Sequence, residues 1–225
     1  MFIVIEGGDA SGKTTTINVL RQEIDNGVFP FLNSQNTKFL KSPTSPFAEI
    51  WKSIDVKEVD SLTRFYFFRT IAQNDSRVVR EYLNQKYNVI LERNIFSTEA
   101  FNETLDEKMN ITDPLFQSKN HLIRNGLCKS DITFLLDLPD DERNARILKR
   151  AKKTGKYSWW EDPKFQHTFN EKLRIIGKRE KMIVINTSQN APYDVANIIF
   201  DNIKKTVKNQ KIASIVTSLK KSKEY

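Results

Sequence analysis

Cysteine is almost absent from this sequence, which has one, Cys128, among 225 residues. A single thiol excludes an internal disulfide and fits a reducing compartment, so we expect a cytoplasmic protein. Long apolar runs are absent too, since none approaches the roughly 20 residues of a membrane-spanning helix. The apolar stretch at the amino-terminus is interrupted by Glu6, which argues against a signal peptide. We therefore predict a protein without a membrane segment.

Basic residues are in excess, with 36 Lys and Arg against 28 Asp and Glu, a formal net charge of +8. Residues 203–225 hold seven of the lysines and one acid, Glu224, which is +6 and leaves +2 for the rest. A lysine-rich tail of this kind is more often a solvated helix or chain end than a specific binding surface. Nucleic-acid binding through the tail is thus an alternative that we do not favour.

Internal repeats, low-complexity linkers and a convincing domain boundary are also missing. We expect one domain over residues 1–202, followed by the lysine-rich tail or helix at 203–225. Short apolar, β-branched runs alternate with longer segments of helical periodicity, a pattern typical of an α/β fold with a buried parallel sheet between helices. The five runs are Phe2–Ile5, Lys38–Leu40, Asn88–Leu91, Ile132–Leu136 and Met182–Ile185.

The strongest motif follows the first run, where residues 7–14 satisfy G-x-x-x-x-G-K-[ST] between a predicted strand and a predicted amphipathic helix. In such a loop the backbone N–H groups and the helix N-terminus bind phosphate oxygens. Lys13 would reach the β- and γ-phosphates and the Thr14 hydroxyl would bind Mg²⁺. The motif predicts ATP and Mg²⁺ as cofactors. The predicted nucleotide-binding residues are Gly7, Gly8, Asp9, Ala10, Ser11, Gly12, Lys13, Thr14 and Thr15.

A second polar pair, Glu92 and Arg93, follows the third apolar run. At the carboxyl end of a neighbouring strand, Glu92 could hold a metal-bound water and Arg93 could balance the charge of a transferring phosphoryl group. A surface ion pair is the plainer interpretation of this dipeptide alone. The position of the pair directly after the predicted strand favours the catalytic interpretation.

The segment from Glu92 to Asn102 resembles the thymidylate kinase signature D-R-x-x-x-S-x-x-A-Y-Q, with matches at Arg93, Ser97 and Ala100. Glu92, Phe101 and Asn102 are conservative departures from it. Residues 6–14 likewise resemble that family's E-G-x-D-G-x-G-K-[ST]. The resemblance implies that Asp9 contacts the sugar 3′-hydroxyl of the acceptor.

Two further segments resemble the same family. Lys41 and Pro43 fall in F-x-R-E-P, with Lys41 in the position of the arginine that binds the acceptor phosphate. Phe65 and Arg69 resemble a phenylalanine that stacks on thymine and an arginine that reads the base edge, and their spacing of four puts both on one helical face. The alternative for the aromatic run from Phe65 to Phe68 is a place in the core.

A basic segment follows Pro139, with seven Lys and Arg and no acid from Arg143 to Lys156. It indicates a lid, over about residues 143–162, that closes on a triphosphate. By resemblance, Arg146 and Arg150 correspond to the functional lid arginines, and Trp159 replaces an arginine of the family. A solvated basic helix face is the alternative.

Taken together, these segments indicate a P-loop kinase. The family resemblance implies that it transfers phosphate from ATP to dTMP, giving dTDP, and that it forms a homodimer. The expected fold is a three-layer sandwich with a five-stranded parallel sheet and a basic lid. The expected catalytic residues are Lys13, Glu92, Arg93, Arg146 and Arg150. The expected acceptor-binding residues are Asp9, Lys41, Pro43, Phe65, Arg69, Arg93, Ser97, Phe101 and Asn102.

Two alternatives stay open. A deoxynucleoside kinase also carries Glu-Arg after this strand, but it needs a general base before the proline, where this chain has Ser42. A kinase or ATPase that acts on nucleic acid or on a modified nucleotide would use the lysine-rich tail, and salt-sensitive binding would support it.

Overall fold

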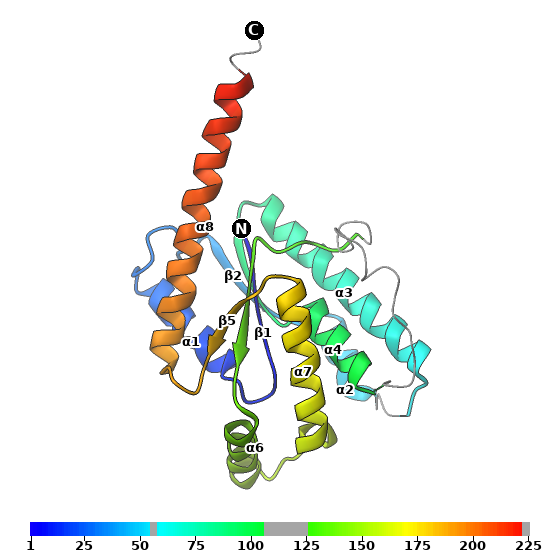
Figure 1. Ribbon diagram of the computed structural model, residues 1–225. Helices are drawn as coiled ribbons and strands as arrows, with labels where there is room; N and C mark the ends of the chain where they lie inside the picture. Colours follow the sequence, from blue (N-terminus) through cyan, green and yellow to red (C-terminus); the bar gives the residue numbers. More distant parts are fainter. Residues whose placement is uncertain (55–57, 106–125, 222–225) are drawn as a thin grey trace.

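A computed structural model of the chain describes residues 1–54, 58–105 and 126–221 (Figure 1). A five-stranded sheet forms its centre, in the order β2-β3-β1-β4-β5, and every pair of neighbouring strands is parallel. The predicted α/β fold is confirmed, and each apolar run forms one strand. The strands are β1 Phe2–Gly7, β2 Thr37–Lys41, β3 Asn88–Glu92, β4 Ile132–Asp137 and β5 Ile183–Asn186.

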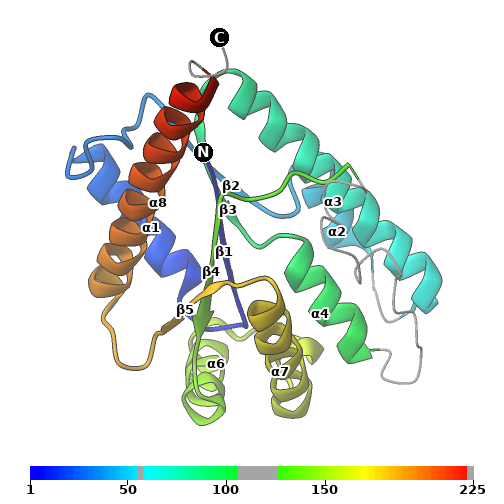
Figure 2. The ribbon, with the colours of Figure 1, turned by 45° about the horizontal axis from the view of Figure 1, so that its top comes forward.

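Helices cover both faces of the sheet, which makes three layers (Figures 1 and 2). α1 and α8 pack on one face, while α3, α4 and α7 lie on the other. All six residues of β1 are buried, because β1 is the central strand and both of its faces meet apolar side chains. The helices are α1 Lys13–Asp25, α2 Phe47–Ser53, α3 Ser61–Asn84, α4 Ile95–Leu105, α6 Asp140–Thr154, α7 Pro163–Arg179 and α8 Pro192–Lys221, with a short 3-10 helix at Trp159–Glu161.

The lysine-rich segment continues α8 without a break. Ile203, the first residue of the predicted tail, is buried in the core together with Ile199. Beyond it, α8 runs past the body of the domain as far as Lys221 (Figure 1). Residues 222–225 of the predicted tail lie outside the described residues. None of the helices in the described part of the chain has the length and apolar content of a membrane span.

The parallel arrangement brings the carboxyl ends of all strands to one edge of the sheet. Gly7 ends β1, Glu92 ends the neighbouring β3, and Asp137 ends β4 on the other side. Ligands of open α/β sheets bind at this edge. The polar residues singled out from the sequence therefore converge there.

Candidate active site

The loop between β1 and α1 passes close to α7 and turns through a left-handed residue. A Cβ atom at Gly8 would lie 2.0 Å from the Asn170 side-chain oxygen, so any larger residue there would have to displace the Asn170 side chain. Gly12, immediately before α1, has φ = 90°. This curvature turns the loop back onto the N-terminus of α1, where the free N–H groups and the helix dipole favour an anion.

Lys13 is buried beneath this loop and points into it. Its ammonium group donates to the carbonyl oxygens of Gly7 at 3.0 Å and Gly8 at 2.6 Å. Burial, and then the positive charge of Arg93, lowers the pKa of Lys13 to about 7. A desolvated amine beside a second cation fits an anionic ligand, because the negative charge of a phosphate would favour the protonated form.

Thr14 and Glu92, the predicted metal-binding pair, lie together. The Thr14 hydroxyl donates to Glu92 Oε1 at 3.0 Å, and the Lys41 ammonium lies 3.1 Å from the same oxygen. A hydroxyl and a carboxylate are hard oxygen donors of the kind Mg²⁺ prefers. No cluster of three or more Asp, Glu, His or Cys side chains that could hold a metal occurs in the described ranges.

Arg93 connects the phosphate loop with α4. Its Nη2 lies 2.5 Å from Asp9 Oδ1, and its Nη1 donates to the Gly7 carbonyl at 3.2 Å and to Ser97 Oγ at 3.3 Å. Burial disfavours the ionised form of Asp9, but the charges of Arg93 and Lys13 outweigh it and hold the pKa of Asp9 below its ordinary value. The two signatures found in the sequence therefore meet at one ion pair.

A cleft of about 490 Å³ opens beside this ion pair. Six of the residues predicted to bind the acceptor line it: Asp9, Lys41, Pro43, Arg93, Ser97 and Phe101. Its other wall is apolar and aromatic, and the sequence did not predict it. That wall includes Trp51, Phe68, Ile71, Trp160, Phe165 and Phe169.

Phe65 and Arg69, the predicted base-binding pair, are not among the residues that line the cleft. Phe68, Ile71 and Asp75 are buried and follow one another at spacings of three and four, so they share one face of α3. This face turns to the cleft. Phe68 packs against Trp51 and Phe101, with ring centroids 5.3 and 5.6 Å apart. Phe65 flanks this face and packs edge-on against Tyr66. Phe68 is thus the residue of this aromatic run that lines the cleft, and the base-binding roles of Phe65 and Arg69 stay predictions.

Three other predicted residues lie on α4, in the phosphate loop and on α1. Asn102 does not line the cleft, and its side-chain amide donates to the Thr98 carbonyl at 3.0 Å within α4. Ala10 lies at the turn of the phosphate loop with φ = 57°, and Thr15 is exposed in the first turn of α1. The acceptor signature thus reaches the cleft through Arg93, Ser97 and Phe101, while Asn102 lies outside its lining.

The predicted lid is the helix α6 with the 3-10 helix that follows it. Arg146 donates to the Ala10 carbonyl at 3.4 Å and to the Thr187 carbonyl at 3.2 Å, so it joins the phosphate loop to the loop after β5. Arg150 forms an ion pair with Glu161, a residue of the 3-10 helix. The two lid arginines therefore contact different segments, and Arg146 is the one on the phosphate loop.

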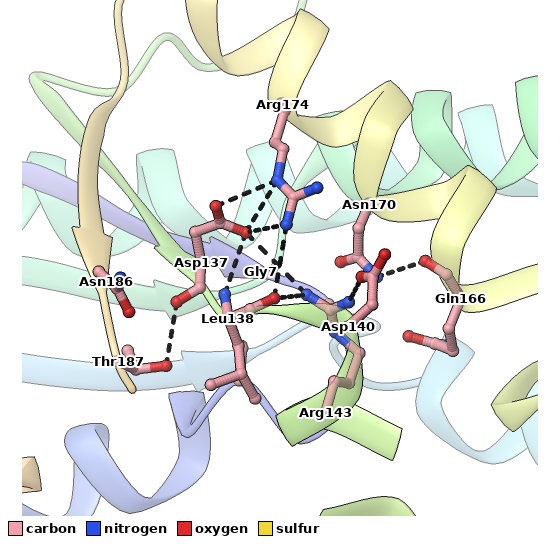
Figure 3. A network of polar contacts seen from close by, with 12 residues as sticks. Gly7, Asp137, Leu138, Asp140, Arg143, Gln166, Asn170, Arg174, Asn186 and Thr187 are labelled. Carbon is pink, nitrogen blue, oxygen red and sulfur yellow. Dashed lines mark hydrogen bonds and ion pairs between the residues drawn. The ribbon is translucent and has the colours of Figure 1, made fainter. Parts of the chain in front are cut away.

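The first turn of α6 is fixed by a polar network with β4 and α7 (Figure 3). Arg143, 1% exposed, donates to the Leu138 carbonyl and to Asp140. Arg174 Nε donates to both carboxylate oxygens of Asp137 at 3.1 Å. Arg143 thus belongs to the buried base of the helix and not to an exposed basic face.

The order of the strands, with the phosphate loop after the central one and a carboxylate–arginine pair after its neighbour, places the chain among the P-loop phosphotransferases. Comparison with known proteins narrows the class. The family model for thymidylate kinase matches residues 5–199, and the chain belongs to the thymidylate kinase family.

Curated relatives and solved structures agree with this family. The thymidylate kinase of Mycoplasma genitalium is 30% identical over 155 residues, which cover 67% of this chain and 70% of the relative. That of Prochlorococcus marinus strain NATL1A is 32% identical over 168 residues, 69% of this chain and 76% of the relative. The crystal structure of thymidylate kinase from Ehrlichia chaffeensis has the same fold, with a TM-score of 0.62 at 21% identity over 92% of this chain and 98% of that one. A thymidylate kinase structure from Candida albicans has a TM-score of 0.62 at 21% identity, over 91% of each chain.

Proposed function

We propose that this chain transfers the γ-phosphate of ATP to dTMP, giving dTDP. The observation that carries this proposal is the position of Arg93, which binds Asp9 in the phosphate loop and Ser97 in the acceptor signature at the edge of one cleft. A donor site and an acceptor site that share one arginine favour direct transfer between two bound nucleotides.

The triphosphate of ATP would lie in the phosphate loop. The N–H groups at the start of α1, the Lys13 ammonium and the Arg146 guanidinium are the donors available to its oxygens. Anion binding would raise the pKa of Lys13 from about 7 and hold the side chain protonated.

Thr14 and Glu92 fit a magnesium ion, the first through its hydroxyl and the second through a water molecule. Magnesium, when bound, supplies positive charge that neutralises the phosphate oxygens. The protein's own part is to keep the hydroxyl and the carboxylate together at the loop.

The acceptor dTMP would occupy the cleft, with its phosphate toward Lys41 and Arg93 and its base between the aromatic side chains. Phe68 takes the role in the base site that the sequence resemblance gives to Phe65, because Phe68 is the one that lines the cleft. An acceptor phosphate oxygen is already anionic and needs no general base. Catalysis therefore consists of positioning and of neutralising charge with Lys13, Arg93 and the lid arginines.

A nucleoside acceptor is not favoured by the geometry of the cleft. Its hydroxyl would need a general base, and Asp9 is the one carboxylate among the described residues that line the cleft. The ion pair with Arg93 makes Asp9 a weaker base.

The test is ADP release with ATP and Mg²⁺ against dTMP, dUMP, dCMP, dGMP, dAMP and thymidine. We expect turnover with dTMP and none with thymidine. Turnover with thymidine alone would contradict the proposal and move the chain to the nucleoside kinases. Silence across the panel in protein that binds ATP would contradict it in favour of a polymeric or modified acceptor.

The proposal includes a homodimer, in line with the family resemblance, and a cytoplasmic location, in line with the single cysteine. Light scattering after gel filtration tests the assembly, and a mass of twice 26.2 kDa is expected. No nucleic-acid partner is part of the proposal.

A further inference from the structure

Glu6 is a buried carboxylate that the mechanism above leaves unused. It lies in β1 with 0% exposure, and it does not line the cleft. Its Oε1 accepts from the backbone N–H groups of Asn94 at 2.8 Å and Ser97 at 3.3 Å, and its Oε2 accepts from the Ser97 hydroxyl. Burial raises the pKa of Glu6 despite these bonds. A carboxylate is costly in such a place, and its three partners all belong to the turn that begins α4.

Ser97 links Glu6 to Arg93 through its hydroxyl group. While its hydroxyl donates to Glu6, its oxygen accepts from Arg93 Nη1 at 3.3 Å. Arg93 has φ = 65°, in the left-handed region that a bulky residue adopts only where its surroundings impose it. Glu6, Ser97, Arg93 and Asp9 therefore form one chain of polar contacts from the centre of the sheet to the phosphate loop.

We propose that Glu6 is a positioning residue for phosphoryl transfer, which orients Arg93 through Ser97 and through the first turn of α4. The inference rests on the proposed function. A fixed Arg93 would hold its positive charge in place before negative charge develops on the transferring phosphoryl group. Glu6 touches no ligand itself and acts only through its neighbours. Its loss should therefore affect the chemical step more than the binding of either nucleotide.

The first variant is Glu6→Gln, which keeps the size of the side chain and an oxygen for the two backbone N–H groups. It replaces the acceptor of the Ser97 hydroxyl by a donor, so the contact to Arg93 loses its support. We expect kcat with dTMP to fall about tenfold or more, while KM for ATP and for dTMP stays within about twofold. The variant Ser97→Ala should lose a similar factor in kcat. The double variant should be no slower than the slower single one, because the two residues act in series.

Glu99→Gln is the matched control. Glu99 is another buried glutamate, burial also raises its pKa, and it lies on α4, the helix whose first turn Glu6 contacts. It forms a two-pronged ion pair with Arg179 at 2.6 and 2.8 Å and does not line the cleft. We expect a lower melting temperature in this variant, with kcat within about twofold of the wild type.

A second readout follows Arg93 directly, through the Nε–H signal of its side chain in ¹H–¹⁵N spectra, assigned with Arg93→Lys. In the wild type and in Glu99→Gln, we expect the Arg93 signal to be resolved from the signals of mobile arginines. In Glu6→Gln, we expect it to overlap with them. Absence of dTMP turnover in the wild type would contradict the proposed function, and the spectra would still test Glu6. An unchanged Arg93 signal in Glu6→Gln overturns the inference whatever happens to turnover. A loss of kcat in Glu99→Gln equal to that in Glu6→Gln overturns it as well.

Discussion

At the scale of single residues, Lys13 combines burial with a task that requires charge. Its ammonium group binds two loop carbonyls and has a pKa of about 7. The folded chain therefore holds this amine partly neutral at physiological pH. A bound triphosphate would reverse this by favouring the protonated form.

We expect ATP binding to take up protons at pH 8, because the Lys13 amine is largely neutral in the free protein and becomes charged beside phosphate. Calorimetric titration in buffers of different ionisation enthalpy measures the uptake. It should disappear in Lys13→Met. An equal uptake in that variant would show that another group binds the proton.

The same pKa shift predicts how stability depends on pH. The pKa of Lys13 in the folded chain is lowered to about 7 from an ordinary value of 10.5, so between these values the unfolded chain binds more protons. Stability contributed by this group should therefore rise with pH across that window. Urea unfolding of the wild type and Lys13→Met at several pH values should show a flatter curve for the variant.

Lys13→Ala should lower kcat by about a thousandfold or more, since the lysine neutralises charge on the transferring group. Steady-state ADP release measures the loss, and circular dichroism should show an unchanged fold. A variant that keeps its activity would contradict the assignment of the phosphate loop.

Phe68 and Phe65 offer a paired test of the aromatic wall. Phe68 lines the cleft and Phe65 does not. Stacking of a base on an aromatic ring contributes about 1–3 kcal/mol. We therefore expect Phe68→Leu to raise KM for dTMP about tenfold or more, and Phe65→Leu to change it less than about threefold. Equal increases in KM for dTMP in the two variants would indicate that Phe65 also belongs to the base site.

At the scale of elements, the strands and the phosphate loop could be predicted because their signals are local. Buried parallel strands are continuous apolar runs, and the loop is a contiguous motif between a strand and a helix. All five strands and the contact between Thr14 and Glu92 followed from such signals.

The cleft wall could be predicted only in part, because it is assembled from elements far apart in the sequence. Trp51 comes from α2, Phe68 from α3 and Phe165 from α7. Four consecutive aromatic residues also leave the facing positions of α3 undetermined, since periodicity needs polar gaps to define a face. The burial of Arg143 could not be predicted either. The sequence shows the charge of this residue, but it does not show that the side chain forms a buried ion pair.

The base of α6 yields a prediction of its own. Arg143→Met would remove the buried guanidinium that donates to Asp140 and to the Leu138 carbonyl, and would leave them only the contacts from His167 and Arg174. We expect the free energy of unfolding to fall by about 1–3 kcal/mol. Lys149, exposed on the same helix, is the matched position, and Lys149→Met should change it by less than about 0.5 kcal/mol. Urea unfolding measures both. Equal changes would mean that the network in Figure 3 adds nothing to stability.

At the scale of the whole molecule, α8 both closes one layer of the sandwich and extends beyond it (Figure 1). Its buried contacts are made by Val195, Ala196, Ile199 and Ile203, with Val207 partly buried. These positions precede the part of the helix that leaves the body. The domain should therefore retain its stability and its activity without the last part of the chain.

We expect truncation after Asn209 to leave kcat and the melting temperature unchanged. Truncation after Asn202 removes Ile203 and Val207 from the core and should lower the melting temperature, because a fully buried isoleucine contributes about 1.5–3 kcal/mol. Calorimetry and ADP release compare the two. A loss of kcat in the longer of the two truncated chains would show that the lysine-rich segment takes part in the reaction.

The aromatic wall has one more consequence, which concerns light. The chain has three tryptophans. Trp51 and Trp160 line the cleft, and the ring of Trp159 lies 5.9 Å from that of Phe101, which also lines it. The indole emission of the protein therefore comes entirely from the surroundings of one cleft. A nucleotide that enters it should change that emission, so the unlabelled protein would report the arrival of its own acceptor.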